Sequence, residues 1–184
     1  MAEQLAEPIE IAEALNALSN VYGGRGLFRE RVDIELRRLE LSHDPRFTDI
    51  HRRIELLNQA GAALVYVGEY VQAMPLLLEA EKLASQTQGL DQLLTVLRVQ
   101  AHCRYLMDQW DQVIKIEEKW RALEKRYPNF FKLISASCFQ VALNASVHAR
   151  RGESEQAAAL REESMKIMLG TDGTEEMFER DNYY

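Results

Sequence analysis

One spacing recurs along the chain and constrains its fold more than any other feature of the sequence. Residues typical of turns lie 42, 40 and 44 residues apart, at Gly26, Gly68, Asp108 and Gly152. Between these turns, apolar residues recur at steps of three and four, as helices with one buried stripe require. A period of this length holds one pair of helices. The spacing therefore predicts four helical hairpins that follow one another along the chain.

Five further columns of residues fall on the same spacing. They are Leu15, Leu57, Leu97 and Val141; Ser19, Gly61, Ala101 and Ala145; Phe28, Tyr70, Trp110 and Ser154; Arg31, Ala73, Val113 and Ala157; and Leu41, Leu83, Leu123 and Ile167. We expect the aliphatic columns to fill the space between helices. The small residues should let two helix backbones approach to about 8–10 Å.

The predicted helices cover residues 8–23, 27–42, 47–67, 70–85, 90–107, 110–127, 130–151 and 153–169. Pro8 suits a first helical turn, whereas Pro45 and Pro128 cannot stand inside a helix. Gly68 and Gly152 can adopt the left-handed conformation that ends one. With only 9 Gly and 4 Pro among 184 residues, an all-β fold rich in tight turns is excluded. The fold class is all-α.

The repeat resembles the tetratricopeptide repeat (TPR), in a variant with 40–44 residues per repeat instead of about 34. The match is best in the second repeat, in Gly61, Leu64, Gly68, Tyr70, Ala73, Leu77 and Ala80. Arg38 and Trp120 stand where that family has small residues. The resemblance implies a single domain over 1–184, a right-handed superhelix of four hairpins. Its repeats cover 8–45, 46–88, 89–128 and 129–170, followed by an acidic tail at 171–184.

The resemblance also implies a binding surface, because the first helices of such repeats line a concave groove. Carried over position by position, the groove residues are Asn16, Asn20, Glu55, Asn58, Tyr66, Arg98, His102, Tyr105 and Arg150. Asparagine can donate to and accept from a peptide backbone, arginine can pair with a carboxylate, and tyrosine offers flat apolar contact. An extended protein or peptide segment is the expected partner.

Charge and hydropathy narrow the class of partner. The net charge of −7 disfavours a sequence-independent grip on nucleic acid or anionic membrane. No apolar run approaches the roughly 20 residues of a membrane span, and the first 20 residues contain no Lys or Arg. Cys103 and Cys138 are isolated thiols, as expected in a reducing compartment. A cytoplasmic protein without nucleic-acid or membrane partners is expected.

No motif for catalysis or metal binding is present, so we expect no enzyme activity, no cofactor and no metal. His43, His51, His102 and His148 lack zinc-motif spacing. The stretch from Tyr22 to Gly26, YGGRG, lacks the Lys and Ser or Thr of a phosphate loop and is interpreted as a turn. Interleaved Lys, Arg and Glu between 110 and 127 indicate a solvated, salt-bridged face.

The leading hypothesis is therefore a non-enzymatic interaction module. The alternative is a ligand- or peptide-sensing regulatory region of a larger bacterial signalling or transcription protein. The last helix presents Leu160, Met165, Met168 and Leu169, an apolar surface that something should cover. The acidic tail with Met177, Phe178, Tyr183 and Tyr184, a further domain, or a second copy forming a homodimer through this helix would each do so.

Overall fold

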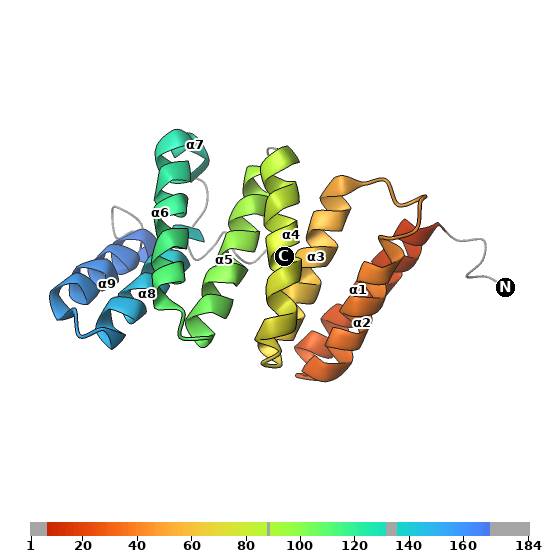
Figure 1. The fold of residues 1–184 in the computed structure, drawn as a ribbon, viewed down its shortest axis with the longest axis horizontal. Coiled ribbons are helices and arrows are strands. Elements are labelled where there is room, and N and C mark those ends of the chain that lie inside the picture. Colours follow the sequence, from red (N-terminus) through yellow and green to blue (C-terminus); the bar gives the residue numbers. More distant parts are fainter. Residues whose placement is uncertain (1–6, 88, 132–135, 170–184) are drawn as a thin grey trace. The chain divides into compact units, whose positions relative to one another are not determined.

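The protein is all-α over the residues that the computed structural model describes, 7–87, 89–131 and 136–169 (Figure 1). Nine helices lie in these ranges. They are α1 (Pro8–Gly24), α2 (Phe28–Leu41), α3 (Ile50–Tyr66), α4 (Tyr70–Thr87), α5 (Leu90–Leu106), α6 (Trp110–Arg126), α7 (Pro128–Phe131), α8 (Ala136–Arg150) and α9 (Ser154–Leu169). None of the described helices is long and apolar enough to cross a membrane.

Seven of the eight predicted helices are confirmed with ends that differ by at most three residues. The predicted helix over 130–151 falls on α7, which begins at Pro128, and on α8, which ends at Arg150, and residues 132–135 between them lie outside the described residues. Proline suits the first position of α7 because it has no backbone N–H to leave unpaired. The predicted tail at 171–184, with Met177, Phe178, Tyr183 and Tyr184, lies outside the described residues.

The four predicted turn residues share one backbone conformation. Their φ angles are 73° at Gly26, 87° at Gly68, 56° at Asp108 and 78° at Gly152, and no other described residue has a positive φ. The residue after each donates its N–H to the carbonyl five positions back, over 2.9 Å in three turns and 3.0 Å in the last. This is the Schellman motif, which ends a helix through a left-handed residue. The predicted register of the repeat is thus confirmed at all four turns.

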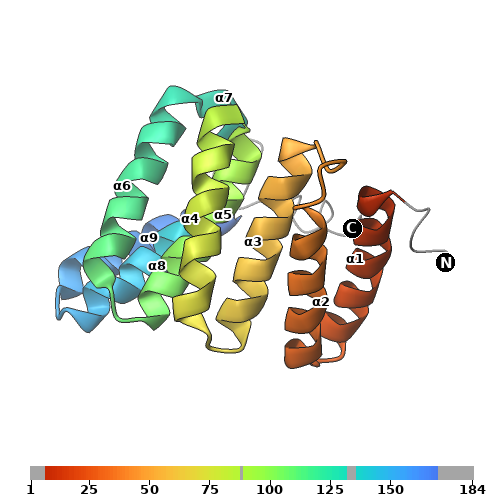
Figure 2. The same cartoon turned by 45° about the vertical axis from the view of Figure 1, so that its right-hand side comes forward.

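The chain divides into two compact units, residues 1–103 and 104–184. In unit 1, α1 packs against α2, α2 against α3, and α3 against α4. The first helices α1, α3 and α5 run in the same direction, and α2 and α4 run against them (Figures 1 and 2). In unit 2, α6 packs against α7 and α8, and α8 packs against α9. Adjacent helices therefore pair in both units.

The small column brings helices together as predicted. Ser19, Gly61, Ala101 and Ala145 are all buried. At Gly61 the approach of α3 to α4 is so close that an added Cβ would lie 2.7 Å from Leu77 Cδ2. Only glycine fits there without displacing the fully buried Leu77 side chain.

The core of unit 2 is smaller and more aromatic. Val141, Ala145 and Leu160 form a cluster between α8 and α9, with Ile167 packed against it. Trp120 is 1% exposed and meets the Phe131 ring edge-on, with ring centroids 6.0 Å apart. The column position that is small in the TPR family is thus filled here by an indole that holds α7 on α6.

The charged face of α6 is salt-bridged, as predicted. Arg121 pairs with Glu117 at 2.8 Å and Glu124 at 3.3 Å on its own helix, and with Glu163 of α9 at 2.6 Å. Because Arg121 bridges two helices, this face also joins α6 to α9.

Candidate functional site

The first helices of unit 1 hold seven of the predicted groove residues at matching heights. His51 Nδ1 of α3 lies 2.9 Å from Gln92 Oε1 of α5, and Gln92 Nε2 donates to the His51 carbonyl at 3.0 Å. Since α3 and α5 run in parallel, residues about 40 apart in sequence lie side by side. This contact places Asn58 of α3 level with Arg98 of α5, about two turns further along.

Asn58 and Arg98 both keep hydrogen-bonding capacity that the described residues do not use. Asn58 is half-buried, and its Oδ1 atom is shielded from solvent without a hydrogen-bond donor. Arg98 is exposed and makes no ion pair within residues 7–87, 89–131 and 136–169. A buried acceptor without a donor costs free energy, which a ligand N–H can recover. This face thus combines one unpaired acceptor with one exposed guanidinium.

His102 lies one turn beyond Arg98 on α5 and is half-buried. Burial lowers the pKa of His102 below its usual value of 6.5. The imidazole is therefore neutral at pH 7, where it can both donate and accept a hydrogen bond. On α1, Asn20 is exposed and Asn16 is half-buried.

The Glu55 carboxylate is bound by two side chains of its own helix. Arg52 Nη1 contacts Glu55 Oε2 at 2.7 Å, and Gln59 donates to Glu55 Oε1 at 3.1 Å. Arg52 also pairs with Glu13 of α1 at 2.7 Å. These contacts join α1 to α3, so Glu55 positions neighbouring helices and its carboxylate is already occupied.

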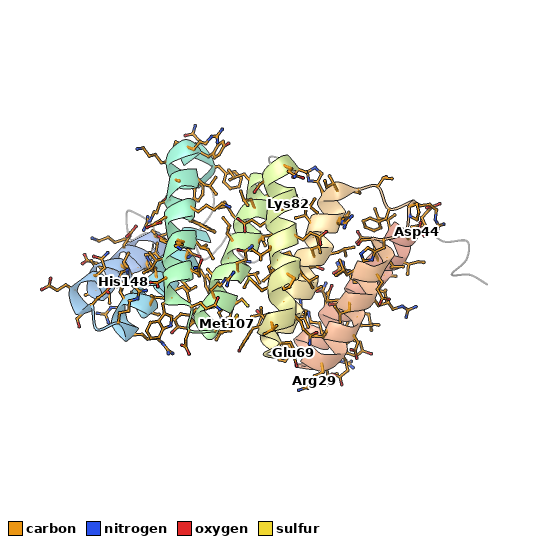
Figure 3. The ribbon with its side chains drawn as sticks, in the orientation of Figure 1. Arg29, Asp44, Glu69, Lys82, Met107 and His148 are labelled. Atoms are coloured by element: carbon orange, nitrogen blue, oxygen red, sulfur yellow. The ribbon has the colours of Figure 1, made fainter. Side chains whose placement is uncertain are left out.

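Tyr66 lies at the turn end of unit 1, against a second helix. Its ring stacks on Phe28 of α2 with centroids 5.7 Å apart and planes 11° from parallel. In Figure 3, Arg29 marks the start of α2, and Glu69 marks the turn between α3 and α4. The tyrosine remains 62% exposed on its other side, so it offers an aromatic surface at the end of α3.

Tyr105 and Arg150 belong to unit 2 and contact each other. Arg150 Nε donates to Tyr105 Oη at 2.9 Å, and the guanidinium carbon lies 5.1 Å from the ring centroid. Asp108 lies 4.0 Å from Arg150 Nη1. This cation–π pair leaves Arg150 largely exposed. The predicted residues thus form two groups, one in each unit.

A buried polar network that the sequence did not predict joins α1, α2 and α3. Arg38 of α2 is 2% exposed and contacts Glu35 at 2.7 Å. Its Nε donates to the Ala12 carbonyl of α1 at 3.0 Å, and its Nη1 donates to Gln59 of α3. Glu35 also accepts from Ser19 of α1. The available signal was the arginine itself, because it stands in a column where the second repeat has Ala80.

One polar pocket of about 370 Å³ lies at the α5–α6 turn in unit 2. It is lined by Arg104, Asp108, Gln109, Trp110, Asp111 and Gln112. Gln109 accepts a hydrogen bond from Arg104, and Arg151 of the α8–α9 turn pairs with Asp111. No group of three or more His, Cys, Asp or Glu side chains within the described residues is arranged to hold a metal ion.

The sequence matches no known protein family, and no curated protein resembles it significantly.

Proposed function

We propose that the chain is a long-repeat TPR-like solenoid that acts as a non-enzymatic interaction module. Two features support the solenoid: the four turns share one hydrogen-bond pattern, and the small column is buried in every hairpin. Stacked hairpins of this kind bind partners on the face formed by their first helices. In unit 1 this face belongs to α1, α3 and α5.

The proposed ligand is an extended peptide, and the observation that carries the proposal is the unpartnered Asn58 Oδ1 on α3, at the level of the exposed Arg98 on α5. An extended backbone offers N–H donors to the unpartnered Asn58 Oδ1. An acidic side chain of the ligand would pair with Arg98 in the two-pronged geometry of guanidinium and carboxylate. Exposed Asn20 of α1 adds a further hydrogen-bonding group to the face formed by the first helices.

Selection from a random peptide library displayed on phage tests this function. Selected peptides are synthesised with a fluorescent label, and their affinity is measured by anisotropy for three chains: the natural one, Asn58→Ala with Arg98→Ala, and a control with Lys82→Ala and Gln86→Ala. The control residues are exposed on the second helix α4 (Figure 3 labels Lys82).

The proposal predicts peptides enriched in Asp or Glu. Their affinity should fall at least about tenfold in the Asn58/Arg98 variant, since a charge-assisted hydrogen bond and a buried acceptor are both lost. The control should bind as the natural chain does. Failure to select any peptide, or equal binding by both variants, would contradict the proposal.

A second candidate function, a sensory region within a larger regulatory protein, is favoured by one observation. Met165, Met168 and Leu169 of α9 are 48%, 45% and 48% exposed. An apolar surface of this kind fits a neighbouring domain or a second copy of the chain. Sedimentation of the natural chain beside a Met165→Glu, Met168→Glu variant tests the homodimer, which predicts that only the variant is monomeric.

A further inference from the structure

Unit 2 buries three polar side chains that each have at least one atom without a hydrogen-bond partner. Gln140 is fully buried and neither atom of its amide has a partner, while Asn144 and Glu117, each 5% exposed, leave Oδ1 and Oε2 unpartnered. We refer to Glu117, Gln140 and Asn144 as the polar seam. Buried polar atoms are almost always hydrogen-bonded, so four exceptions in three residues need a physical explanation.

The seam lies between α6 and α8. On α8, the stripe with Val141 and Ala145 faces α9 in the apolar cluster. Gln140 and Asn144 are one turn apart and about 100° away from that stripe. Because they are buried on a different side of α8, and α6 is the other described helix of unit 2 that packs there, they face α6.

The register of the repeat gives the same placement for Asn144. Its equivalent in the preceding repeat is Gln100, which donates to the Leu77 carbonyl at 2.9 Å and to Glu81 at 2.8 Å. One repeat further along the chain, the residue equivalent to Leu77 is Glu117, and the residue equivalent to Glu81 is Arg121. The position that holds a satisfied amide between α4 and α5 therefore holds an unsatisfied one between α6 and α8.

We propose that the polar seam is where unit 2 opens: the α8–α9 hairpin separates from α6 as one body, and water enters. On opening, the amide of Gln140, Asn144 Oδ1 and Glu117 Oε2 all gain hydrogen bonds to water that the closed state denies them. Opening is therefore easier here than at an apolar interface of the same size. The device is conformational and independent of the proposed peptide site in unit 1.

The hairpin stays intact because its own contacts are satisfied. Ser164 Oγ of α9 donates to the Cys138 carbonyl of α8 at 2.9 Å, beside the apolar cluster. Within the described residues, two ion pairs connect α6 to the hairpin, Arg121 with Glu163 of α9 and Asp111 with Arg151 of the α8–α9 turn, and both are partly exposed. Exposed ion pairs hold weakly, so these ties do not prevent opening.

Hydrogen exchange of the full chain, followed by mass spectrometry, tests the proposal. Gln140→Leu keeps a similar volume and removes the unpartnered amide. It should slow exchange of α8 and α9 together by about five- to tenfold, because closing no longer strands polar atoms. Gln100→Leu is the matched control: it removes a buried amide with two partners and should accelerate exchange in α4 and α5.

Two results would overturn the proposal. One is unchanged or faster exchange of α8 and α9 in a Gln140→Leu chain whose helical content is unaltered. The other is exchange of α6 in step with α8 and α9 in the natural chain, which means that no separate opening exists. If Gln140→Leu does not fold, Asn144→Leu replaces it, with the same expected slowing and the same contradicting result.

Discussion

The buried polar residues of unit 1 and those of unit 2 differ in how completely they are hydrogen-bonded. In the described part of unit 1, Ser19, Glu35, Arg38, Ser42 and Gln100 are buried, and every one is hydrogen-bonded. In that of unit 2, Glu117, Gln140 and Asn144 are buried, and every one keeps an unpartnered atom. Similar residue types in one repeat register therefore serve two purposes. Paired groups fix helix positions, and unpaired groups lower the cost of separating helices.

The largest expected effect comes from breaking the paired network of unit 1. Arg38→Met leaves the Glu35 carboxylate buried without its cation, so we expect a loss of about 3–5 kcal/mol in the free energy of unfolding. Arg29→Met, on the exposed side of the same helix, is the control and should change stability by less than about 0.5 kcal/mol. Urea unfolding measures the stability of both variants. A small loss for Arg38→Met would mean that the buried network does not stabilise unit 1.

The helix spacing of unit 1 provides the next test, at a close and at an open glycine. Gly61→Ala puts a Cβ 2.7 Å from Leu77 Cδ2, so overpacking should outweigh the helix propensity gained and cost about 1–2 kcal/mol. Gly24→Ala has no atom within 4 Å of the new Cβ and should be neutral or stabilising. Thermal unfolding compares the two variants. Equal stability would show that α3 and α4 can move apart at no cost.

The acidic group of the polar seam makes stability depend on pH. Burial raises the pKa of Glu117 above its ordinary 4.5, although Arg121 opposes the shift. The folded state thus holds this proton more tightly. The stability that Glu117 contributes is complete below pH 4.5 and is lost as pH rises through the folded-state pKa.

In the variant Glu117→Gln the side chain does not titrate, so a comparison with the natural chain isolates the pH dependence that Glu117 causes. The difference in unfolding free energy, natural chain minus variant, should grow in favour of the natural chain between pH 7 and pH 4. Urea unfolding at several pH values measures it. A difference that stays constant, or shrinks toward pH 4, would mean that Glu117 is not desolvated in the folded protein.

The smallest effect is expected outside both cores. Arg46 donates to Asp44 at 3.0 and 2.8 Å and lowers the pKa of that carboxyl from 3.8 to about 2. Arg46→Ala should return the pKa toward 3.8, measured by NMR titration, without a measurable change in stability because the pair is exposed. A clear loss of stability at pH 7 would contradict the expectation that exposed ion pairs contribute little to stability.

The sequence predicted the helices and their register well because both depend on local signals. A left-handed residue at a fixed spacing, with an apolar stripe on each side, is enough to place Gly26 or Gly152 at a helix end. Pro128 was predicted to stand outside a helix interior, and it is the first residue of α7.

The candidate site was less predictable, since its members depend on contacts between helices. Sequence position nominated Asn58, Arg98 and Glu55 equally. Only the structure shows that Glu55 is already bound by Arg52 while Asn58 keeps an unpartnered oxygen. Arg38 was noticed as a departure from the small column, but its partners lie 26 and 21 residues away, on other helices.

The central claim, that paired and unpaired buried amides act in opposite directions, is tested most directly by two substitutions measured together in urea. Gln100→Leu removes two buried hydrogen bonds, to the Leu77 carbonyl and to Glu81, so the free energy of unfolding should fall by about 1–3 kcal/mol. Gln140→Leu strands nothing and should leave stability unchanged or raise it. A loss for Gln140→Leu as large as that for Gln100→Leu would contradict the claim.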